Sequence, residues 1–152
     1  MAILETGSKA PAFTLMDQDG KKVRLADFKG KKLLLFFYPK ANTPGCTKQA
    51  CSVSTARSDL KKLGVEALGI SPDLPDKQMK FDLKFKLGFP LLSDADNKVA
   101  KAYGAWGEKS MYGKKYEGII RSSFLIDEKA RIIQAWYKVK PEDTVPLATE
   151  AL

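Results

Sequence analysis

The sequence predicts an α/β domain with a mixed central β-sheet flanked by helices. Two runs, at residues 33–38 and 65–71, are largely apolar, as expected of strands that are buried on both faces. A helix-like segment between them completes a β-α-β unit, whose right-handed crossover makes the two strands parallel. Two hairpin-like segments, one near the start of the chain and one in its last third, add antiparallel strands.

The expected elements follow one another in the order hairpin, strand, helix, strand, helix, short strand, helix and hairpin. Their ranges are 13–16 with 21–25, 33–38, 44–63, 65–71, 72–86, 90–92, 93–103 and 119–126 with 131–137. This order describes a thioredoxin-like fold that begins with a β-hairpin. We expect one such domain over residues 1–152, a length typical of a single domain.

Turn and capping residues set the limits of the first elements. Asp19-Gly20 supplies the turn of the N-terminal hairpin, and residues 26–30 form a turn or a short helical turn before the central strand. Thr43 is a good N-cap for the first helix, Pro44 suits its first position, and Gly64 terminates it.

Apolar spacing and capping residues also define the next two helices. In the second helix, Met79 and Leu83 recur at a spacing that places both near the inner face. At the start of the third helix, Ser93 and Asp96 have the spacing of a capping box, in which each side chain bonds a backbone N–H of the other residue.

The segment after the third helix is expected to be loop-rich over residues 104–118. For the aromatic residues Tyr103, Trp106 and Tyr112, packing in the core or over the sheet edge is favoured over a collar around a substrate entrance. The tail, residues 138–152, holds at most a short helix because it contains two prolines.

The N-terminus and the hydrophobic pattern indicate a cytoplasmic protein. Residues 1–13 lack the basic start and apolar core of a secretory signal peptide, and no apolar run approaches the length of a membrane span. We expect no membrane contact. We also expect a monomer, since no long apolar stripe remains once the sheet is covered.

The chain is basic, with 26 Lys and Arg residues against 18 Asp and Glu residues and a formal net charge of +8. Such an excess suits nucleic-acid binding. However, the lysines are scattered in ones and twos, and no arginine-rich run or RNA-binding signature is present. We expect a solvated lysine surface that helps to recruit an acidic partner, and no nucleic acid. A DNA-binding domain, which would show salt-dependent affinity, is the alternative.

The absence of histidine excludes several kinds of site. The two cysteines are too few for a Cys/His zinc site, so no metal and no cofactor are expected. A Cys-His protease and a Ser-His-Asp hydrolase are likewise excluded. Any activation of a cysteine must therefore come from backbone dipoles and from lysine or arginine.

Cys46 occupies the third position of the first helix, directly after the central buried strand. Backbone N–H groups without helical partners and the positive end of the helix dipole meet there, and both stabilise a thiolate. A buried, inert cysteine is the alternative interpretation. The capped helix start and the second cysteine at position 51 favour a reactive thiol.

The motif Pro39-x-x-x-Thr43-x-x-Cys46 resembles the active-site loop of the peroxiredoxins. Cys51, five residues further on, is similar to the second cysteine of the Q-type, or bacterioferritin-comigratory, branch. Further stretches that resemble this branch, up to about Val139, are Gly69–Asp73, Phe89–Asp94, Ala102–Gly107 and Arg121–Asp127.

The resemblance implies a thiol peroxidase that reduces hydrogen peroxide and organic hydroperoxides. Cys46 would attack the peroxide and become a sulfenic acid, and Cys51 would resolve it as an intramolecular disulfide, which thioredoxin or a similar dithiol would reduce. Thr43, Arg121 and Gly45 would bind the substrate or the sulfur, with Pro39 shielding the pocket. Physically, the N–H groups of the helix start, the Thr43 hydroxyl and a guanidinium are suitable donors for the charge that develops on the leaving oxygen.

The spacing of the two cysteines adds a conformational requirement to this implied disulfide. Residues five apart in a regular helix have Cα atoms about 8.7 Å apart, whereas a disulfide rarely spans more than about 7 Å. The first one or two helical turns must therefore unwind before the bond closes. Thr47, Ser52 and Ser54 are weak helix formers and would assist.

Some residues differ from the family pattern. Gln49 stands where an acidic residue is common, and Ala41 and Asn42 are also neutral, which makes the site less negative. Two other functions are alternatives: a peroxide-sensing redox switch acting through a Cys46–Cys51 disulfide, and a dithiol–disulfide reductase. The reductase is disfavoured because such enzymes typically use Cys-x-x-Cys.

Overall fold

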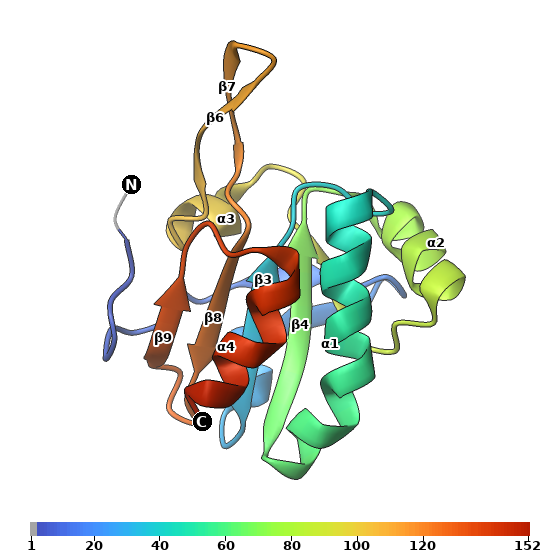
Figure 1. Ribbon diagram of the computed structural model, residues 1–152. Coiled ribbons are helices and arrows are strands. Elements are labelled where there is room, and N and C mark those ends of the chain that lie inside the picture. Colours follow the sequence, from blue (N-terminus) through green and yellow to red (C-terminus); the bar gives the residue numbers. More distant parts are fainter. Residues whose placement is uncertain (1–2) are drawn as a thin grey trace.

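A computed structural model describes residues 3–152 and contains a seven-stranded mixed sheet and a separate two-stranded hairpin (Figure 1). The strands of the main sheet follow in the order β2-β1-β5-β4-β3-β8-β9. They are β1 (Thr14–Met16), β2 (Lys22–Arg24), β3 (Lys32–Phe37), β4 (Val65–Ser71), β5 (Leu91–Ser93), β8 (Ser122–Ile126) and β9 (Ile132–Trp136). The hairpin consists of β6 (Trp106–Met111) and β7 (Lys114–Ile119).

The helices are α1 (Pro44–Lys62), α2 (Pro75–Phe85), α3 (Lys98–Ala102) and α4 (Thr144–Glu150), with short 3-10 turns η1 (Leu25–Phe28) and η2 (Pro141–Asp143). Strand β3 pairs in parallel with β4 and antiparallel with β8, so it lies at the centre of the sheet. This arrangement confirms the expected thioredoxin-like α/β fold with an N-terminal hairpin, and α1 begins and ends as predicted from its cap, its proline and Gly64. None of the helices within residues 3–152 has the length and apolarity needed to cross a membrane.

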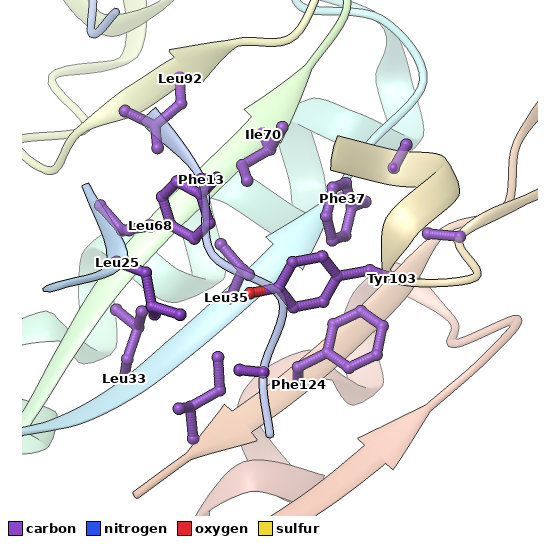
Figure 2. Packing of buried hydrophobic residues seen from close by; sticks show 14 of the residues in the cluster. Phe13, Leu25, Leu33, Leu35, Phe37, Leu68, Ile70, Leu92, Tyr103 and Phe124 are labelled. Atoms are coloured by element: carbon purple, nitrogen blue, oxygen red, sulfur yellow. The ribbon is translucent and has the colours of Figure 1, made fainter. Parts of the chain in front are cut away.

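Alternate residues of β3 pack against opposite layers of the protein. Leu33, Leu35 and Phe37 join a cluster with Tyr103 and Phe124, on the face shown in Figure 2. The intervening residues Leu34 and Phe36, together with Tyr38 directly after the strand, pack toward α1, α2 and α4 on the other face. All six are fully buried, which explains why this run is apolar at every position.

The structure corrects the expected start and inner face of the second helix. Helix α2 begins at Pro75, later than the expected residue 72, because its N-cap Leu74 precedes a proline and is extended. Leu83 was expected near the inner face, yet its exposed fraction is 68%. Phe81, which is buried, takes the inward position.

The predicted Ser93–Asp96 capping box of the third helix was also wrong. Helix α3 begins after Asn97, and the buried carboxylate of Asp94 accepts the N–H groups of Val99 and Ala100 at 3.2 and 2.9 Å. Burial raises the pKa of Asp94, and these two N–H donors partly oppose that shift.

Residues 104–118, expected as loop, contain most of the β6–β7 hairpin, which projects from the end of the sheet at which α1 begins (Figure 1). Its turn residues Tyr112 and Gly113 have φ values of 52° and 79°, as in a tight I′ hairpin turn. Residues 114–117 of β7 are all exposed, so this strand has no buried face that would require apolar residues. The alternation of apolar and polar residues by which a strand is recognised in a sequence is therefore absent.

Asp94→Ala is expected to lower the free energy of unfolding by about 1–3 kcal/mol, because two N–H groups lose their buried acceptor. Urea denaturation of the variant and of the unchanged protein measures this. Asp96→Ala is the matched control: Asp96 is exposed and accepts the Lys98 N–H, so a change within about 0.5 kcal/mol is expected. Equal losses in both variants would contradict the capping role of Asp94.

Candidate active site

The candidate site is built around the start of α1, where the sequence places Cys46. Thr43 is the N-cap, Pro44 is the first helical residue, and Cys46 is the third. The N–H groups of Gly45 and Cys46 have no carbonyl one turn earlier to bond, and Pro44 has no N–H. Cys46 is buried, with an exposed fraction of 1%, and its side chain is a free thiol.

Arg121 brings a positive charge to this buried sulfur. Its Nη2 donates to the Cys46 Sγ at 3.4 Å, and its Nη1 donates to the Gln49 Oε1 at 2.7 Å. Arg121 was expected inside a strand, but it lies in the break between β7 and β8. There its carbonyl accepts the Val139 N–H at 2.9 Å, which fixes the backbone from which the side chain extends.

Gly45 makes room for this guanidinium. A Cβ atom at position 45 would lie 3.1 Å from the Arg121 Nη2 and 3.6 Å from the Pro141 Cγ. The first of these distances is tighter than ordinary van der Waals contact, so a larger residue would displace Arg121. Glycine at this position therefore allows the arginine to approach the helix start.

Gln49 also belongs to the site, although nothing in the sequence indicated this. It was identified only as a neutral residue at a commonly acidic position, but its fully buried amide connects two chain segments. Its Oε1 accepts from Arg121, and its Nε2 donates to the Thr144 Oγ1 at 3.0 Å. Thr144 lies 95 residues away, so no local sequence pattern indicates the pair.

Thr43 does not make the capping bond expected of it. Its hydroxyl was expected to cap the helix and to bind the substrate or the sulfur, yet it donates to the Lys40 carbonyl at 2.7 Å. The lone pairs of the Thr43 oxygen remain able to accept a hydrogen bond.

The loop between β3 and α1 is anchored to the end of β4. Asp73 accepts the Ala41 N–H at 2.7 Å and the Ser71 hydroxyl at 2.7 Å. Beneath the loop, the buried Tyr38 hydroxyl donates to Gln78, and burial raises the Tyr38 pKa. The Gly69–Asp73 stretch therefore has a structural role, since its residues Ser71 and Asp73 hold the loop before α1 in place.

A cavity of about 330 Å³ adjoins the site and is lined in part by Pro39, Lys109, Arg121 and Val139. Burial lowers the pKa of Lys109, the nearby charge of Arg121 lowers it further, and Cys46 opposes the shift. A larger cavity of about 510 Å³ lies at the other end of α1 and contains none of the predicted site residues. Of these two cavities, only the smaller one is lined by predicted site residues, Pro39 and Arg121.

Cys51 lies five residues, or about 1.4 turns, after Cys46 in the same uninterrupted helix and is half-buried, also as a free thiol. It packs against the apolar cluster that contains Cys46. Because α1 is regular over this range, the estimate of about 8.7 Å between the two Cα atoms applies. The described conformation thus keeps the two thiols too far apart for a disulfide.

The three aromatic residues considered for a collar have separate positions. Tyr103 is fully buried in the core and donates to the Pro11 carbonyl. Tyr112 is 98% exposed at the hairpin turn. Trp106 is half-buried beside Lys101. They do not form a shared collar.

Comparison with known proteins decides the family. Residues 6–135 match the profile of the AhpC/TSA family. The chain belongs to the AhpC/TSA family. Peroxiredoxin Bcp of Escherichia coli K12 is 54% identical over 129 residues, which cover 85% of this chain and 83% of that protein.

Two solved structures place this AhpC/TSA chain in the Q-type, or bacterioferritin-comigratory, branch. A Xylella fastidiosa PrxQ variant is 30% identical, with a TM-score of 0.89 and full coverage of both chains. The Xanthomonas campestris bacterioferritin comigratory protein is 32% identical, with a TM-score of 0.87, over 99% of this chain and 97% of that one. The expected family and the expected enzyme class, a peroxide-reducing thiol peroxidase, are confirmed.

Gln49→Glu is expected to move the reaction of Cys46 with peroxide to higher pH. A carboxylate at this position would offset the charge of Arg121, so the thiolate would lose part of its stabilisation. The pH dependence of the second-order rate constant, measured by stopped flow, tests this. Thr55→Glu, at an exposed position of the same helix, is the control and should leave the profile unchanged. A profile that stays in place in Gln49→Glu would contradict the role of Gln49.

Proposed function

We propose that the Cys46 thiolate attacks the terminal oxygen of hydrogen peroxide or an organic hydroperoxide. The oxygen–oxygen bond breaks, Cys46 becomes a sulfenic acid, and the leaving alkoxide or hydroxide takes up a proton. The observation that carries this proposal is the hydrogen bond from Arg121 to the buried Sγ at the helix start. The Xanthomonas campestris relative has alkyl peroxide reduction activity, which supports organic hydroperoxides as substrates.

The proposed substrate contacts follow from the donors and acceptors around the sulfur. The Gly45 and Cys46 N–H groups and the Arg121 guanidinium are donors for the charge that moves to the leaving oxygen. The Thr43 oxygen accepts the peroxide O–H, since its own hydrogen is donated to Lys40. Pro39, at the wall of the adjoining cavity, limits the access of water.

Cys51 is the proposed resolving residue. Its thiol condenses with the Cys46 sulfenic acid, which forms a disulfide and releases water. The first turns of α1 must open for this step, because the helical spacing of about 8.7 Å exceeds what a disulfide spans. The chain would therefore alternate between a folded, peroxide-reactive form and a locally unwound form that resolves.

A thiol reductant must then cleave the disulfide, and we propose thioredoxin or a similar dithiol protein. The reducing cytoplasm supplies such proteins and keeps both cysteines as thiols. We further propose that the active unit is one domain over residues 1–152 and a monomer. The redox-switch alternative would give stoichiometric oxidation without turnover when thioredoxin, its reductase and NADPH are supplied.

Intact-mass measurement after one equivalent of hydrogen peroxide tests the chemistry. The reduced wild type is expected to lose two hydrogens, since Cys46 and Cys51 form a disulfide, whereas Cys51→Ser should gain one oxygen at Cys46. Cys46→Ser is the control and should not change in mass on the same timescale. Absence of reaction in the wild type would overturn the proposed function.

A further inference from the structure

The C-terminal segment packs on the part of α1 that must open before Cys51 reaches Cys46. This segment consists of η2 and α4, residues 141–150, and both elements lie against α1 (Figure 1). The chemistry proposed above gives it no role. Three of its contacts fall on residues 45, 48 and 49, within the first two turns of the helix, whereas Ala148 packs further along α1 in a cluster with Leu60.

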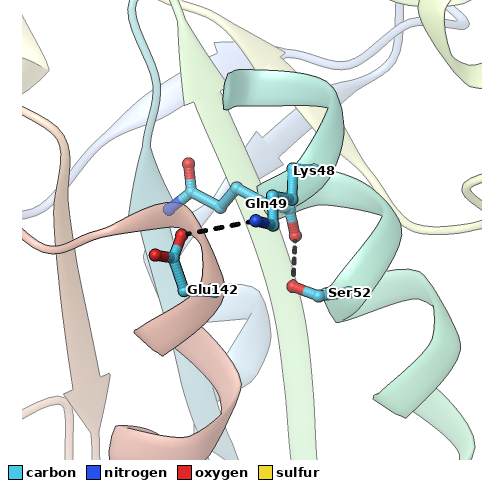
Figure 3. A network of polar contacts seen from close by, with 4 residues as sticks. All are labelled: Lys48, Gln49, Ser52 and Glu142. Carbon is cyan, nitrogen blue, oxygen red and sulfur yellow. Dashed lines mark hydrogen bonds and ion pairs between the residues drawn. The ribbon is translucent and has the colours of Figure 1, made fainter. Parts of the chain in front are cut away.

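Two of these contacts lie at the surface. The Pro141 Cγ would be 3.6 Å from a Cβ atom at Gly45, so η2 covers the helix start. Glu142 pairs with Lys48 at 3.8 Å, as Figure 3 shows. Both side chains of this pair are more than half exposed, so the ion pair contributes little.

The third contact is buried and specific. The Gln49 side chain extends from α1 toward the neighbouring segment (Figure 3), where its Nε2 donates to Thr144, and both side chains are fully buried. With its nitrogen held by Thr144, the amide presents its oxygen to Arg121. Unwinding of the helix at Gln49 would break both bonds and leave buried polar groups without partners, which is costly.

One apolar contact of the C-terminal segment also involves the start of α1. Val145 of α4 packs against the cluster that contains Cys46 and against which Cys51 also packs. An opening of the first turns of α1 would therefore separate Cys51 from a cluster that the C-terminal segment helps to cover.

We propose that Thr144 is a positioning residue through which the C-terminal segment clamps the first turns of α1 in the peroxide-reactive conformation. The proposal rests on the peroxidase function and the resolving role of Cys51. The Cys46 sulfenic acid then has two fates: Cys51 condenses with it and releases water, or a second peroxide oxidises it to a sulfinic acid and is itself reduced to an alcohol or water. A tighter clamp favours the second fate, because the helix opens less often.

Thr144→Val tests the clamp, because it keeps the shape of the side chain and removes the hydroxyl. Thr144→Ser retains the hydroxyl and should behave as the wild type. Thr149→Val makes the same chemical change at an exposed position of α4, where the hydroxyl donates to the Val145 carbonyl of its own helix, and is the matched control. Should Thr144→Val fail to fold, Thr144→Ala removes the same bond with a smaller side chain.

Amide hydrogen exchange of the reduced proteins, at residues 50–52, is the decisive measurement. Loss of one buried hydrogen bond should speed exchange there by about two- to tenfold in Thr144→Val. Exchange in the core strand β3 should stay unchanged, which separates a local clamp from a general loss of stability. Unchanged exchange at residues 50–52, or equal changes in Thr144→Ser or Thr149→Val, would overturn the proposal.

The two chemical steps should also change in opposite directions. In Thr144→Val, disulfide formation should be faster and the sulfinic fraction per turnover at high peroxide lower, whereas the first step, measured in a Cys51→Ser background, should be slower because Gln49 orients Arg121 less well. Changes of both steps in the same direction would contradict the clamp. The exchange experiment needs no peroxide, so its result is independent of whether the peroxidase proposal holds.

Discussion

The positive charge of Arg121 must be accommodated in a partly buried position, and much of the structure serves this requirement. A guanidinium removed from water is unfavourable unless its N–H groups have partners. Here the partners are the Cys46 sulfur and the Gln49 amide oxygen, both on α1. The arginine itself comes from the junction of β7 and β8, and Gly45 leaves the space it occupies. The sheet, the first helix and the C-terminal segment therefore meet at one charged group.

The elements that sequence patterns predicted well are those whose signals are local. Strand β4 has the expected limits, and α1 ends at its predicted glycine, because apolar runs, an N-cap and a left-handed glycine act over a few residues. The patterns failed where tertiary packing decides. Leu83 is exposed although its spacing suggested otherwise, and Asp94 replaces the expected cap because the fold turns its carboxylate toward α3.

The candidate site was predictable in part for the same reason. Cys46 and Gly45 follow from their places in a capped helix, and Arg121 was identified only through the resemblance, since it lies 75 residues from the sulfur it contacts. The hydroxyl direction of Thr43 depends on the path of the loop. The link from Gln49 to Thr144 needs the C-terminal segment to fold back on α1, and no periodicity or cap in either stretch encodes that approach.

The hydrogen bond between the Ala41 N–H and Asp73 has a consequence for how fast the two sulfurs meet. If it persists while the helix start is open, the released chain is a tether of about ten residues held at both ends, and the entropy of closing such a loop is small. Loops of this length close within roughly 10–100 ns, and the effective concentration of one end at the other is on the order of millimolar or more. Diffusion of the two ends of this tether toward each other would then not limit the rate at which the two sulfurs meet. Under the proposed mechanism, the lifetime of the oxidised sulfur would then depend on how often the helix opens and on the rate of the condensation itself.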